Sequence, residues 1–331
     1  MKNKIRWAIL GAGRIANAFA KEFSLMRNAE LVAVASSDKA RATDFAKQYN
    51  IPKALSHDEL YTLGEVDAVY VASTHNFHFE QVLKCLHNNK AVLCEKPITV
   101  NDTDFKKLMS VSKEKKVFLM EAMWTYFLPA TQKARQWLDE GRIGKLKVIQ
   151  SDFAVPMEKK LEGRIYNPNL AGGSLLDLGV YPIALTYYYL NRAPEKIVAS
   201  GIMTSTGVDE QVGMIFQYGG VSATLFTSVT TRMSNKFRLF GEEGYIELPD
   251  FWKAGSVKLF DKEFNLVETY EDNRPSRGFI FEMQHATDMI LDGRIESPVI
   301  PHLRSNEIQE TMTEIRKQIG LKFPFENSNS E

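Results

Sequence analysis

The chain has 331 residues, of which 44% are hydrophobic and 25% are charged, as in soluble globular proteins. Lys plus Arg and Asp plus Glu each number 41, so the net charge is zero. This balance argues against a general nucleic-acid binder, which needs a basic surplus to neutralise phosphates. No apolar run is long enough to span a membrane and Met1–Ile5 does not resemble a signal peptide, so we expect a cytoplasmic protein of two domains.

Short apolar runs alternate with amphipathic stretches over the first third of the chain. The runs are rich in Val, Ile, Leu and Ala, which is typical of parallel strands covered on both faces. They are Arg6–Leu10, Leu31–Ala35, Ala68–Ala72, Ala91–Cys94 and Val117–Met120. Helices are predicted over Arg14–Met26, Lys39–Tyr49, Phe77–Asn88 and Thr103–Lys113, and a capping box at Ser56–Glu59 predicts another. This alternation predicts a doubly wound parallel sheet over residues 1–122.

Strands dominate after Met123. Gln211–Tyr218 and Val221–Thr230 alternate apolar with polar residues, and Gly219-Gly220 joins them as a hairpin turn. We therefore expect an α+β domain with an antiparallel sheet over residues 123–325, followed by a disordered tail over 326–331. The other predicted strands are Lys145–Phe153, Ile197–Thr204, Phe237–Phe240, Tyr245–Leu248, Val257–Phe260 and Leu266–Tyr270. The predicted helices are Thr131–Glu140, Ser174–Leu190, Arg277–Leu291 and His302–Gln318.

A glycine-rich turn follows the first predicted strand and opens the first predicted helix. Gly11-Ala12-Gly13-Arg14-Ile15-Ala16 reads GxGxxA. The first glycine allows a tight turn, the second lets a pyrophosphate approach the backbone, and a small third residue lets the helix pack on the strand. The helix N-terminus adds partial positive charge. We predict dinucleotide binding at this turn, with a glycine turn used only for packing as the alternative.

The end of the second predicted strand discriminates between NAD and NADP. An NAD site usually places Asp or Glu there to bind the ribose hydroxyls. This chain has Ser36 at that position, followed by Ser37, and Lys39 or Arg41 could join their hydroxyls to hold a 2′-phosphate. Asp38 is suited to cap the following helix. The prediction is NADP(H), with NAD(H) as the alternative cofactor and an exposed helix face as the alternative reading of the two basic residues.

Three further motifs carry a resemblance to a known family. Glu95-Lys96-Pro97 and Glu121-Ala122-Met123-Trp124 each follow a predicted strand, and a segment from Gly172-Gly173 to Tyr181 opens a helix. With the GxGxxA turn, they resemble the Gfo/Idh/MocA oxidoreductases, and within them the dimeric dihydrodiol dehydrogenases and NADP-dependent D-xylose dehydrogenases. The similarity runs almost end to end. It implies a Rossmann domain, then an α+β domain with a large, mainly antiparallel open sheet, and a homodimer or higher homo-oligomer.

The resemblance also implies site residues. At three positions this chain differs from residues that are common among the relatives. Tyr181 stands where many relatives have His, as in the dihydrodiol branch, whereas Tyr126 and Ser37 stand where that branch commonly has Arg. The branch's substrate and phosphate contacts therefore do not carry over. The cofactor contacts implied by the turn and the family motifs together are Gly11, Ala12, Gly13, Arg14, Ile15, Ser36, Ser37, Arg41, Asn76, Glu95 and Lys96. Trp124 and Arg164 are candidate substrate contacts, with core packing and a surface ion pair as their alternatives.

Oxidation of a secondary alcohol requires a base for the hydroxyl proton. Tyrosine has an ordinary pKa of about 10, but a neighbouring ammonium or a positive nicotinamide favours the phenolate. We predict Tyr181 as general acid/base, Lys96 as its cationic partner, and Asp177, four residues earlier on the helix, as an orienting group. The respective alternatives are a core tyrosine, a solvated lysine at a strand end and a carboxylate at a helix N-terminus. Tyr187–Tyr189 are interpreted as packing or interface residues.

Taken together, these features predict an NADP(H)-dependent oxidoreductase that transfers a hydride between nicotinamide C4 and a carbinol carbon of a sugar, polyol or trans-dihydrodiol. No metal, nucleic-acid or membrane partner is expected; His75 and His78 have no further spaced ligands for zinc. One alternative is a sugar-phosphate or anhydrosugar reductase of the same family. The alternative from a different class is a non-catalytic NAD(P)-binding sensor or regulator.

Overall fold

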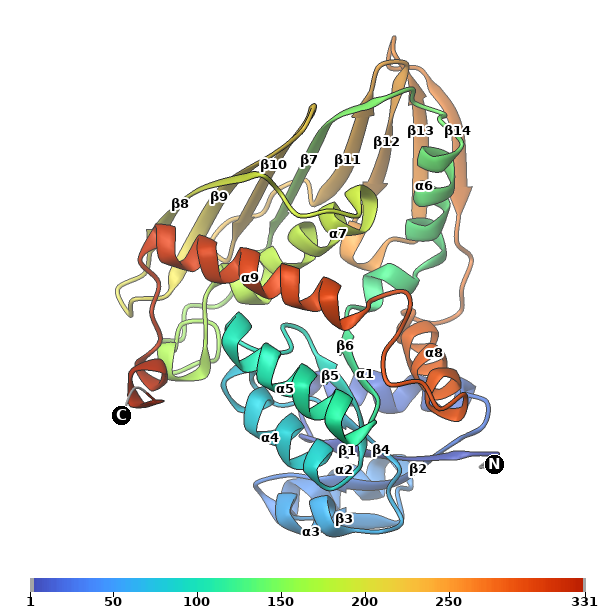
Figure 1. Cartoon of the computed structure of the whole chain (residues 1–331), viewed down its shortest axis with the longest axis vertical. Coiled ribbons are helices and arrows are strands. Elements are labelled where there is room, and N and C mark those ends of the chain that lie inside the picture. The colour runs from blue at the N-terminus through green and yellow to red at the C-terminus, as the bar shows by residue number, and fades with distance from the viewer. Residues whose placement is uncertain (1–2, 330–331) are drawn as a thin grey trace. The chain divides into compact units, whose positions relative to one another are not determined.

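The computed structural model describes residues 3–329 and divides into two compact units (Figure 1). The first unit comprises Met1–Trp124 and Ser276–Asn306, and the second comprises Thr125–Pro275 and Glu307–Glu331. From the sequence, residues 276–306 are predicted to belong to the second domain. In the structure these residues belong to the unit that holds the parallel sheet.

A six-stranded parallel sheet forms the centre of the first unit, in the order β3-β2-β1-β4-β5-β6. Its strands are β1 (Ile5–Leu10), β2 (Ala29–Ala35), β3 (Lys53–Leu55), β4 (Ala68–Val71), β5 (Ala91–Glu95) and β6 (Leu119–Ala122). Every residue of β4, β5 and β6 is buried, because helices cover both faces of the sheet. The prediction of a doubly wound parallel sheet is confirmed. The sequence analysis misses only β3, an edge strand whose three residues are too few for a periodic pattern.

The helices of the first unit lie close to their predicted positions. They are α1 (Arg14–Glu22), continued by the 3-10 turn η1 (Phe23–Leu25), α2 (Lys39–Tyr49), α3 (His57–Thr62), α4 (His75–His87), α5 (Asp102–Lys115) and α8 (Phe279–Leu291). The predicted capping box is present at α3: the Ser56 hydroxyl accepts from the Glu59 backbone N–H, and the Glu59 carboxylate accepts from the Ser56 N–H.

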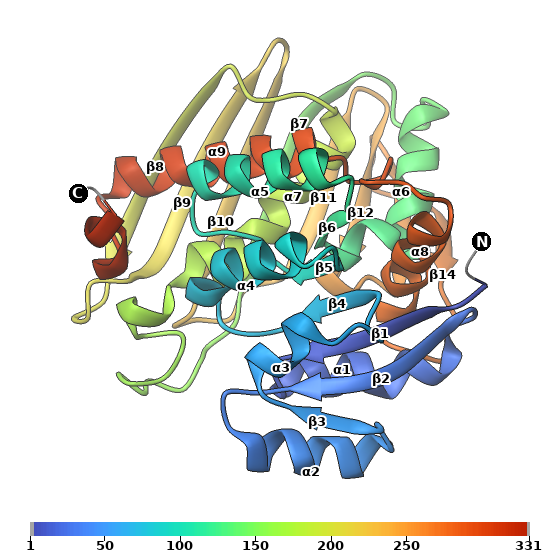
Figure 2. The same cartoon turned by 60° about the horizontal axis from the view of Figure 1, so that its bottom comes forward.

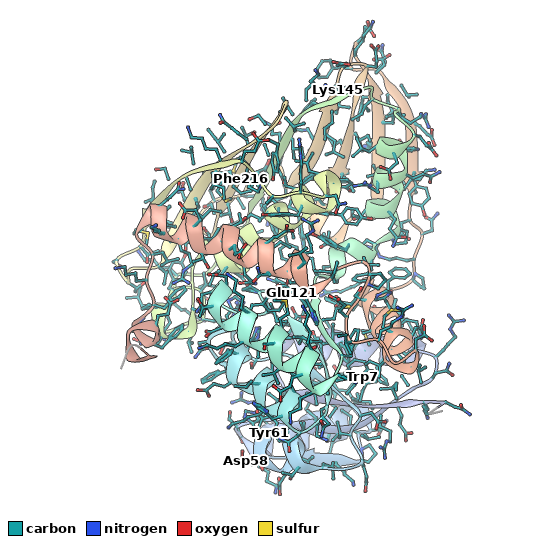
Figure 3. All side chains as sticks on the ribbon, in the orientation of Figure 1. Trp7, Asp58, Tyr61, Glu121, Lys145 and Phe216 are labelled. Atoms are coloured by element: carbon teal, nitrogen blue, oxygen red, sulfur yellow. The ribbon has the colours of Figure 1, made fainter. Side chains whose placement is uncertain are left out.

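Long-range hydrogen bonds hold α8 against the parallel sheet. The Glu22 carboxylate at the end of α1 accepts from the backbone N–H groups of Arg277 and Ile280, at 2.7 and 2.9 Å. The Trp7 indole N–H of β1 donates to the Thr287 hydroxyl of α8 at 3.1 Å (Figure 3). These contacts cap the helix N-terminus and satisfy a fully buried indole, which explains why residues 276–306 join the first unit.

An eight-stranded sheet dominates the second unit, in the order β14-β13-β12-β11-β7-β10-β9-β8. Its strands are β7 (Leu146–Ala154), β8 (Lys196–Met203), β9 (Asp209–Tyr218), β10 (Val221–Ser228), β11 (Lys236–Gly241), β12 (Gly244–Pro249), β13 (Ser256–Asp261) and β14 (Leu266–Glu271). Tyr218 pairs with Val221 across the predicted hairpin, and alternate residues of β9, Phe216 among them, are buried (Figure 3). All neighbours are antiparallel except β7 and β10, so the prediction of a mainly antiparallel sheet is confirmed.

Helices α6 (Pro129–Asp139) and α7 (Val180–Leu190) lie on one face of this sheet (Figure 2). The predicted helix over Ser174–Leu190 is in fact two segments, because Leu175–Gly179 (η4) forms a π turn before α7 begins. In this turn the Val180 N–H bonds the Leu175 carbonyl five residues back. Pro182 contributes to the break because it has no N–H to continue the ordinary helical pattern towards the Leu178 carbonyl.

The chain closes with α9 (His302–Ile319) and the 3-10 turn η6 (Pro324–Asn329). The remaining 3-10 turns are η2 (Trp124–Phe127), η3 (Pro168–Leu170) and η5 (Phe251–Lys253). The sequence analysis expects a disordered tail from Glu326, but this residue is part of η6 and its carboxylate is paired with the buried Arg316 guanidinium. The pairing gives the start of the predicted tail a fixed partner. Residues 330–331 lie outside the described part of the chain.

Candidate active site

The glycine-rich turn packs against the loop that follows β4. Gly11 has a φ of +104°, and a Cβ at this position would lie 2.9 Å from the carbonyl carbon and oxygen of Ala72. Gly13 is the N-cap of α1 and has an ordinary φ of −98°. With no side chain at Gly13, the first N–H groups of α1 are open to an anionic group. The two glycines therefore have different tasks: Gly11 allows the chain to pass Ala72, and Gly13 leaves the helix N-terminus uncovered.

This difference predicts opposite outcomes for two similar substitutions. Gly13→Ala meets only the Ala72 carbonyl, at 4.0 Å, so the protein should fold with a nearly unchanged melting temperature. Its Cβ would stand where a pyrophosphate approaches, so we expect the Kd for NADP(H) to rise about 10-fold or more. Gly11→Ala should instead lower the melting temperature through backbone strain and overlap. Thermal unfolding of the free protein and fluorescence titration with NADPH separate the two effects; equal Kd values for Gly13→Ala and wild type would contradict this division.

At the end of β2, the structure presents a hydroxyl and a guanidinium and no strand-end carboxylate. Asp38 caps α2, accepting from the N–H groups of Ala40 and Arg41 at 2.9 and 3.3 Å, so the predicted capping role is confirmed. The Ser36 hydroxyl is buried and accepts from the Asp38 N–H at 3.3 Å. Ser37 and Arg41 are exposed, with the Arg41 guanidinium 3.8 Å from the Asp38 carboxylate.

Glu95 ends β5 beside β4, and Lys96 follows it. The Glu95 carboxylate is buried and accepts from the Tyr70 hydroxyl of β4. Burial, together with the Glu95 charge, holds the pKa of Tyr70 well above its ordinary value, so the phenol stays protonated and remains a donor. Lys96 is half-buried at the carboxyl edge of the sheet. Since β1, β4 and β5 are neighbours, the glycine turn and Lys96 lie at the same edge, where open parallel sheets bind ligands.

Glu121 of β6 is buried and holds the segment that follows Lys96 (Figure 3). Its carboxylate accepts from the Ile98 N–H at 3.0 Å and from the Ser305 hydroxyl at 2.8 Å. Burial raises the pKa of Glu121 from 4.5 to about 7, although these hydrogen bonds act in the opposite direction. The sequence analysis uses Glu121 only as part of a motif and assigns it no role. The motif pointed to this residue, but only its hydrogen bonds with Ile98 and Ser305 show that it holds the segment after Lys96.

The raised pKa of Glu121 predicts a pH dependence of stability. The folded state binds the proton more tightly than the unfolded state, so this contribution is fully present below pH 4.5 and is lost as the pH rises through about 7. The shift corresponds to at most about 3 kcal/mol. Relative to Glu121→Gln, the wild-type free energy of unfolding should therefore fall between pH 5 and 8. This interval covers most of the distance between the ordinary pKa of 4.5 and the raised pKa of about 7. Urea unfolding at several pH values measures this, with Asp44→Asn on the exposed side of α2 as control; parallel curves for wild type and Glu121→Gln would refute it.

In the second unit, Asp209 of β9 holds the Gly172-Gly173 motif. Its carboxylate accepts from the Ser174 hydroxyl at 2.8 Å and from the Leu175 N–H at 2.6 Å. Gly173 has a φ of +112°, and a Cβ there would lie 2.0 Å from an Asp209 carboxylate oxygen. Burial raises the pKa of Asp209 to about 6. Asp209 is a positioning residue that sequence reasoning missed, because nothing local in the chain links it to a motif 35 residues earlier.

Tyr181 and Asp177 have different surroundings. Tyr181 is in the first turn of α7, 8% exposed, and its ring meets the Phe153 ring edge to face at 5.5 Å. Asp177 belongs to the π turn, and its carboxylate accepts from the Arg164 guanidinium at 2.9 Å. Both carboxylate and guanidinium are largely shielded from solvent. The structure thus joins two predicted site residues, Asp177 and Arg164, that the sequence analysis treats separately.

Three further tyrosines, Tyr126, Tyr187 and Tyr189, use their hydroxyls in contacts within the second unit. The Tyr126 hydroxyl donates to the Ala184 carbonyl and is buried, so this departure from the branch pattern is a core contact. The Tyr187 hydroxyl bonds the Thr311 hydroxyl at 2.8 Å, and the Tyr189 hydroxyl donates to the Thr131 carbonyl at 3.2 Å. Trp124, in the first unit, stacks on Phe279 with ring centroids 4.5 Å apart. The interpretation of these helix tyrosines as packing residues is confirmed for Tyr187 and Tyr189.

Comparison with known proteins identifies the family. Residues 5–123 match the model for the oxidoreductase family with an NAD-binding Rossmann fold, and residues 131–247 match the GFO/IDH/MocA C-terminal domain. A trans-1,2-dihydrobenzene-1,2-diol dehydrogenase of Mus musculus is 36% identical over 329 residues, covering 97% of this chain and 98% of the mouse protein. The chain belongs to the Gfo/Idh/MocA oxidoreductase family. Its NAD-binding Rossmann domain and its class as an oxidoreductase follow from this membership.

Further relatives agree with the family assignment. The enzyme of the same name from Xenopus tropicalis is 34% identical, covering 96% of this chain and 99% of that protein. Among solved structures, KijD10, a 3-ketoreductase from Actinomadura kijaniata in complex with NADP, has a TM-score of 0.87 at 24% identity, covering 96% of this chain and 98% of its own. An aldose-aldose oxidoreductase from Caulobacter crescentus has a TM-score of 0.87 at 21% identity, covering 95% and 97%. These two structures support the fold of this Gfo/Idh/MocA member.

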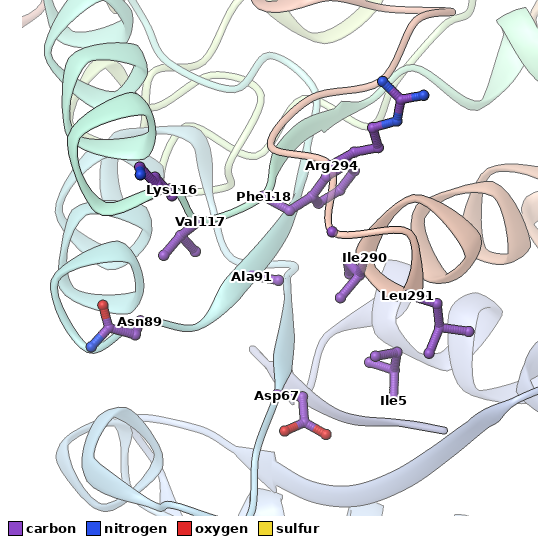
Figure 4. A pocket seen from close by; sticks show the side chains of 11 residues that line it. Ile5, Asp67, Asn89, Ala91, Lys116, Val117, Phe118, Ile290, Leu291 and Arg294 are labelled. Atoms are coloured by element: carbon purple, nitrogen blue, oxygen red, sulfur yellow. The ribbon is translucent and has the colours of Figure 1, made fainter. Parts of the chain in front are cut away.

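A pocket in the first unit is lined by residues that are not among the predicted cofactor contacts (Figure 4). It is lined by Ile5 and Ala91, the first residues of β1 and β5, and by Asp67, which directly precedes β4. It therefore lies at the amino ends of the parallel strands, opposite the edge that carries Gly11 and Lys96. Open α/β sheets bind ligands beyond their carboxyl ends, so this pocket is not the candidate active site.

Within residues 3–329, no three His, Cys, Asp or Glu side chains come together in a way that could hold a metal ion. Over the same residues, no helix combines the length and the apolar character needed to cross a membrane.

Proposed function

We propose that the chain is an NADP(H)-dependent oxidoreductase that transfers a hydride between nicotinamide C4 and a carbinol carbon of a sugar, polyol or trans-dihydrodiol. The observation that carries this proposal is the shared carboxyl edge of β1, β4 and β5, where the Gly11–Gly13 turn and Lys96 lie. The names of the diol dehydrogenase relatives support the substrate class.

NADP(H) is favoured over NAD(H) by the end of β2. Asp38 is engaged in capping α2 and stands two residues beyond the strand-end position, while Ser37 and Arg41 are exposed. A hydroxyl and a guanidinium would bind a 2′-phosphate through charge-assisted hydrogen bonds. The fit to a dinucleotide rests on Gly13, whose missing Cβ leaves the N-terminus of α1 open. When bound, the nicotinamide supplies or accepts the hydride.

The remaining chemistry is assigned to side chains of this chain. In oxidation, the Tyr181 phenolate oxygen takes the proton of the substrate hydroxyl, and in reduction the phenol returns it. The Lys96 ammonium favours the phenolate through its charge. Asp177 and Arg164 act as a unit: the carboxylate fixes the guanidinium at 2.9 Å, and the guanidinium donors are suited to substrate oxygens. Trp124 is proposed as an apolar substrate contact.

The test is turnover with a panel of aldoses, polyols and trans-vicinal diols, followed through the absorbance of reduced nicotinamide with NADP or NAD as oxidant. We expect turnover with at least one class and a higher kcat/KM with NADP. Activity confined to the reduction of sugar phosphates or anhydrosugar ketones would favour the alternative reductase. Tight NADP(H) binding without turnover in either direction would favour a sensor.

We further propose a homodimer formed through the outer face of the eight-stranded sheet. Val198, Ile202 and Ile215 are exposed on β8 and β9, and Val198 pairs directly with Ile215. They lie on the opposite side of the sheet from buried Met214. Such an apolar face on a soluble enzyme is typical of a protein interface.

The self-association is tested by placing charge on this face. Ile202→Lys combined with Ile215→Lys should change the mass measured by light scattering from dimer to monomer, because the two charges would be buried without partners. Leu161→Lys, at another exposed apolar position, should leave the mass unchanged. A wild-type monomer, or a double variant that remains a dimer, would contradict the proposed interface.

A further inference from the structure

His78 lies between two loops that carry predicted cofactor-site residues. It is on α4 and fully buried. Its ring Nδ1 is 2.9 Å from the Pro97 carbonyl oxygen, and its Nε2 is 3.2 Å from the Ser73 carbonyl oxygen. A single side chain therefore joins the loop after β4 to the segment after β5.

Each of the two carbonyls belongs to a segment that also carries predicted site residues. Ser73 follows Ala72, whose carbonyl faces Gly11, and precedes Asn76 in the first turn of α4. Pro97 directly follows Lys96. Because consecutive Cα atoms are separated by a fixed distance, a contact at the Pro97 carbonyl limits the directions available to the Lys96 backbone.

A second contact holds the same segment from the other side. The Ile98 N–H donates to the buried Glu121 carboxylate at 3.0 Å. The backbone of Lys96 is thus held by β5 before it and by His78 and Glu121 after it. The His78 ring also reaches the loop after β4, through its contact with the Ser73 carbonyl.

We propose that His78 is a positioning residue for Lys96, and that its contact with the Pro97 carbonyl fixes the direction in which the lysine leaves the sheet, while the Ser73 carbonyl lies against its other ring nitrogen. This rests on the proposed function only for the catalytic consequence, since the contacts themselves are independent of the reaction. A neutral imidazole has one N–H, so it donates to one carbonyl at a time. Both partners are carbonyl oxygens, so the tautomer of the ring decides which of them accepts the hydrogen bond.

The two contacts can be separated by two amide substitutions. The amide of Asn reaches about as far as the histidine Nδ1, so His78→Asn keeps a donor for the Pro97 carbonyl and loses the contact to Ser73. The longer Gln places its amide near the Nε2 position, so His78→Gln keeps a donor for Ser73 and loses Pro97. His87→Asn, on the exposed end of the same helix, is the matched control.

The primary experiment reads the surroundings of Lys96 without any substrate. The lysines of the full-length protein are reductively methylated with ¹³C-formaldehyde, and the Lys96 signal is assigned by its loss in Lys96→Met. We expect this NMR signal to move in His78→Gln and to stay at the wild-type position in His78→Asn and His87→Asn. Unchanged Lys96 signals in both His78 variants would overturn the proposal, as would equal displacement in both, which indicates a general packing role.

Kinetics give the second measurement. With the substrate found in the panel assay, His78→Gln should lower kcat by about 10- to 100-fold with little change in KM, because a small misplacement of a catalytic group has an effect of this size. His78→Asn should keep most of kcat. If Lys96→Met retains turnover, the proposed role of Lys96 fails while the NMR result still decides the role of His78. If Lys96→Met is inactive and His78→Gln has wild-type kcat and Lys96 signal, only the His78 proposal fails.

Discussion

Tyr181→Phe should lower kcat by about 10² to 10⁴-fold, the usual range for loss of a positioned acid/base group. The substitution removes only the hydroxyl. The remaining ring keeps its edge-to-face contact with Phe153 and its place in the first turn of α7. We therefore expect the Kd for NADPH to remain near its wild-type value, and the loss of stability to be no larger than that of one hydroxyl contact, about 1 kcal/mol. Steady-state kinetics, thermal unfolding and NADPH titration on the same preparation check the three expectations.

A second tyrosine on the same helix provides the control. Tyr189→Phe removes a buried hydroxyl that donates to the Thr131 carbonyl at 3.2 Å, so it should lower stability by about 1 kcal/mol. Its kcat should stay close to wild type, because this hydroxyl is engaged in packing. Near-normal turnover in Tyr181→Phe would remove Tyr181 from the mechanism, whatever the behaviour of Tyr189→Phe.

Lys96→Met should lower kcat by about 10²-fold or more, since the substitution keeps a long apolar stem and removes the charge that we propose favours the phenolate. Lys96 is half-buried at the carboxyl edge of β5, and the hydrogen bonds that hold its neighbours, from His78 to Pro97 and from Ile98 to Glu121, use other residues. Because Tyr181 and Lys96 are proposed to act on one proton transfer, the double variant should be little slower than the slower single variant.

Lys90 is a matched structural lysine in the same unit. Its ammonium is buried and donates to the carbonyls of Leu63 and Val66 at 2.7 and 3.1 Å. Lys90→Met should lower the free energy of unfolding by about 1 to 3 kcal/mol by removing these two buried hydrogen bonds, with kcat nearly unchanged. If Lys96→Met behaved like Lys90→Met, losing stability and keeping turnover, Lys96 would be a structural residue.

The elements themselves could be predicted because their signals are local. The boundaries of α2 coincide with the predicted Lys39–Tyr49, and the capping box at Ser56 and the hairpin at Gly219-Gly220 lie where the sequence places them. Each depends on residues within a few positions of one another. The motifs of the cofactor edge were recognisable for the same reason: Gly11–Ala16 and Glu95–Pro97 are short segments with their own chemical pattern.

What the sequence determined by itself is therefore most of the elements, their order, the parallel and mainly antiparallel character of the two sheets, and the segments that carry the candidate chemistry; β3 and the π turn η4 were not among them. The tertiary structure alone decided which distant groups meet: Glu22 with the N-terminus of α8, Asp209 with the Gly173 turn, and Arg164 with Asp177. It also decided the parallel pairing of β7 with β10. The physical reason is that periodicity, capping and turn patterns arise from neighbouring residues. A hydrogen bond between residues far apart in the chain depends instead on how all the intervening elements pack, which no local pattern records.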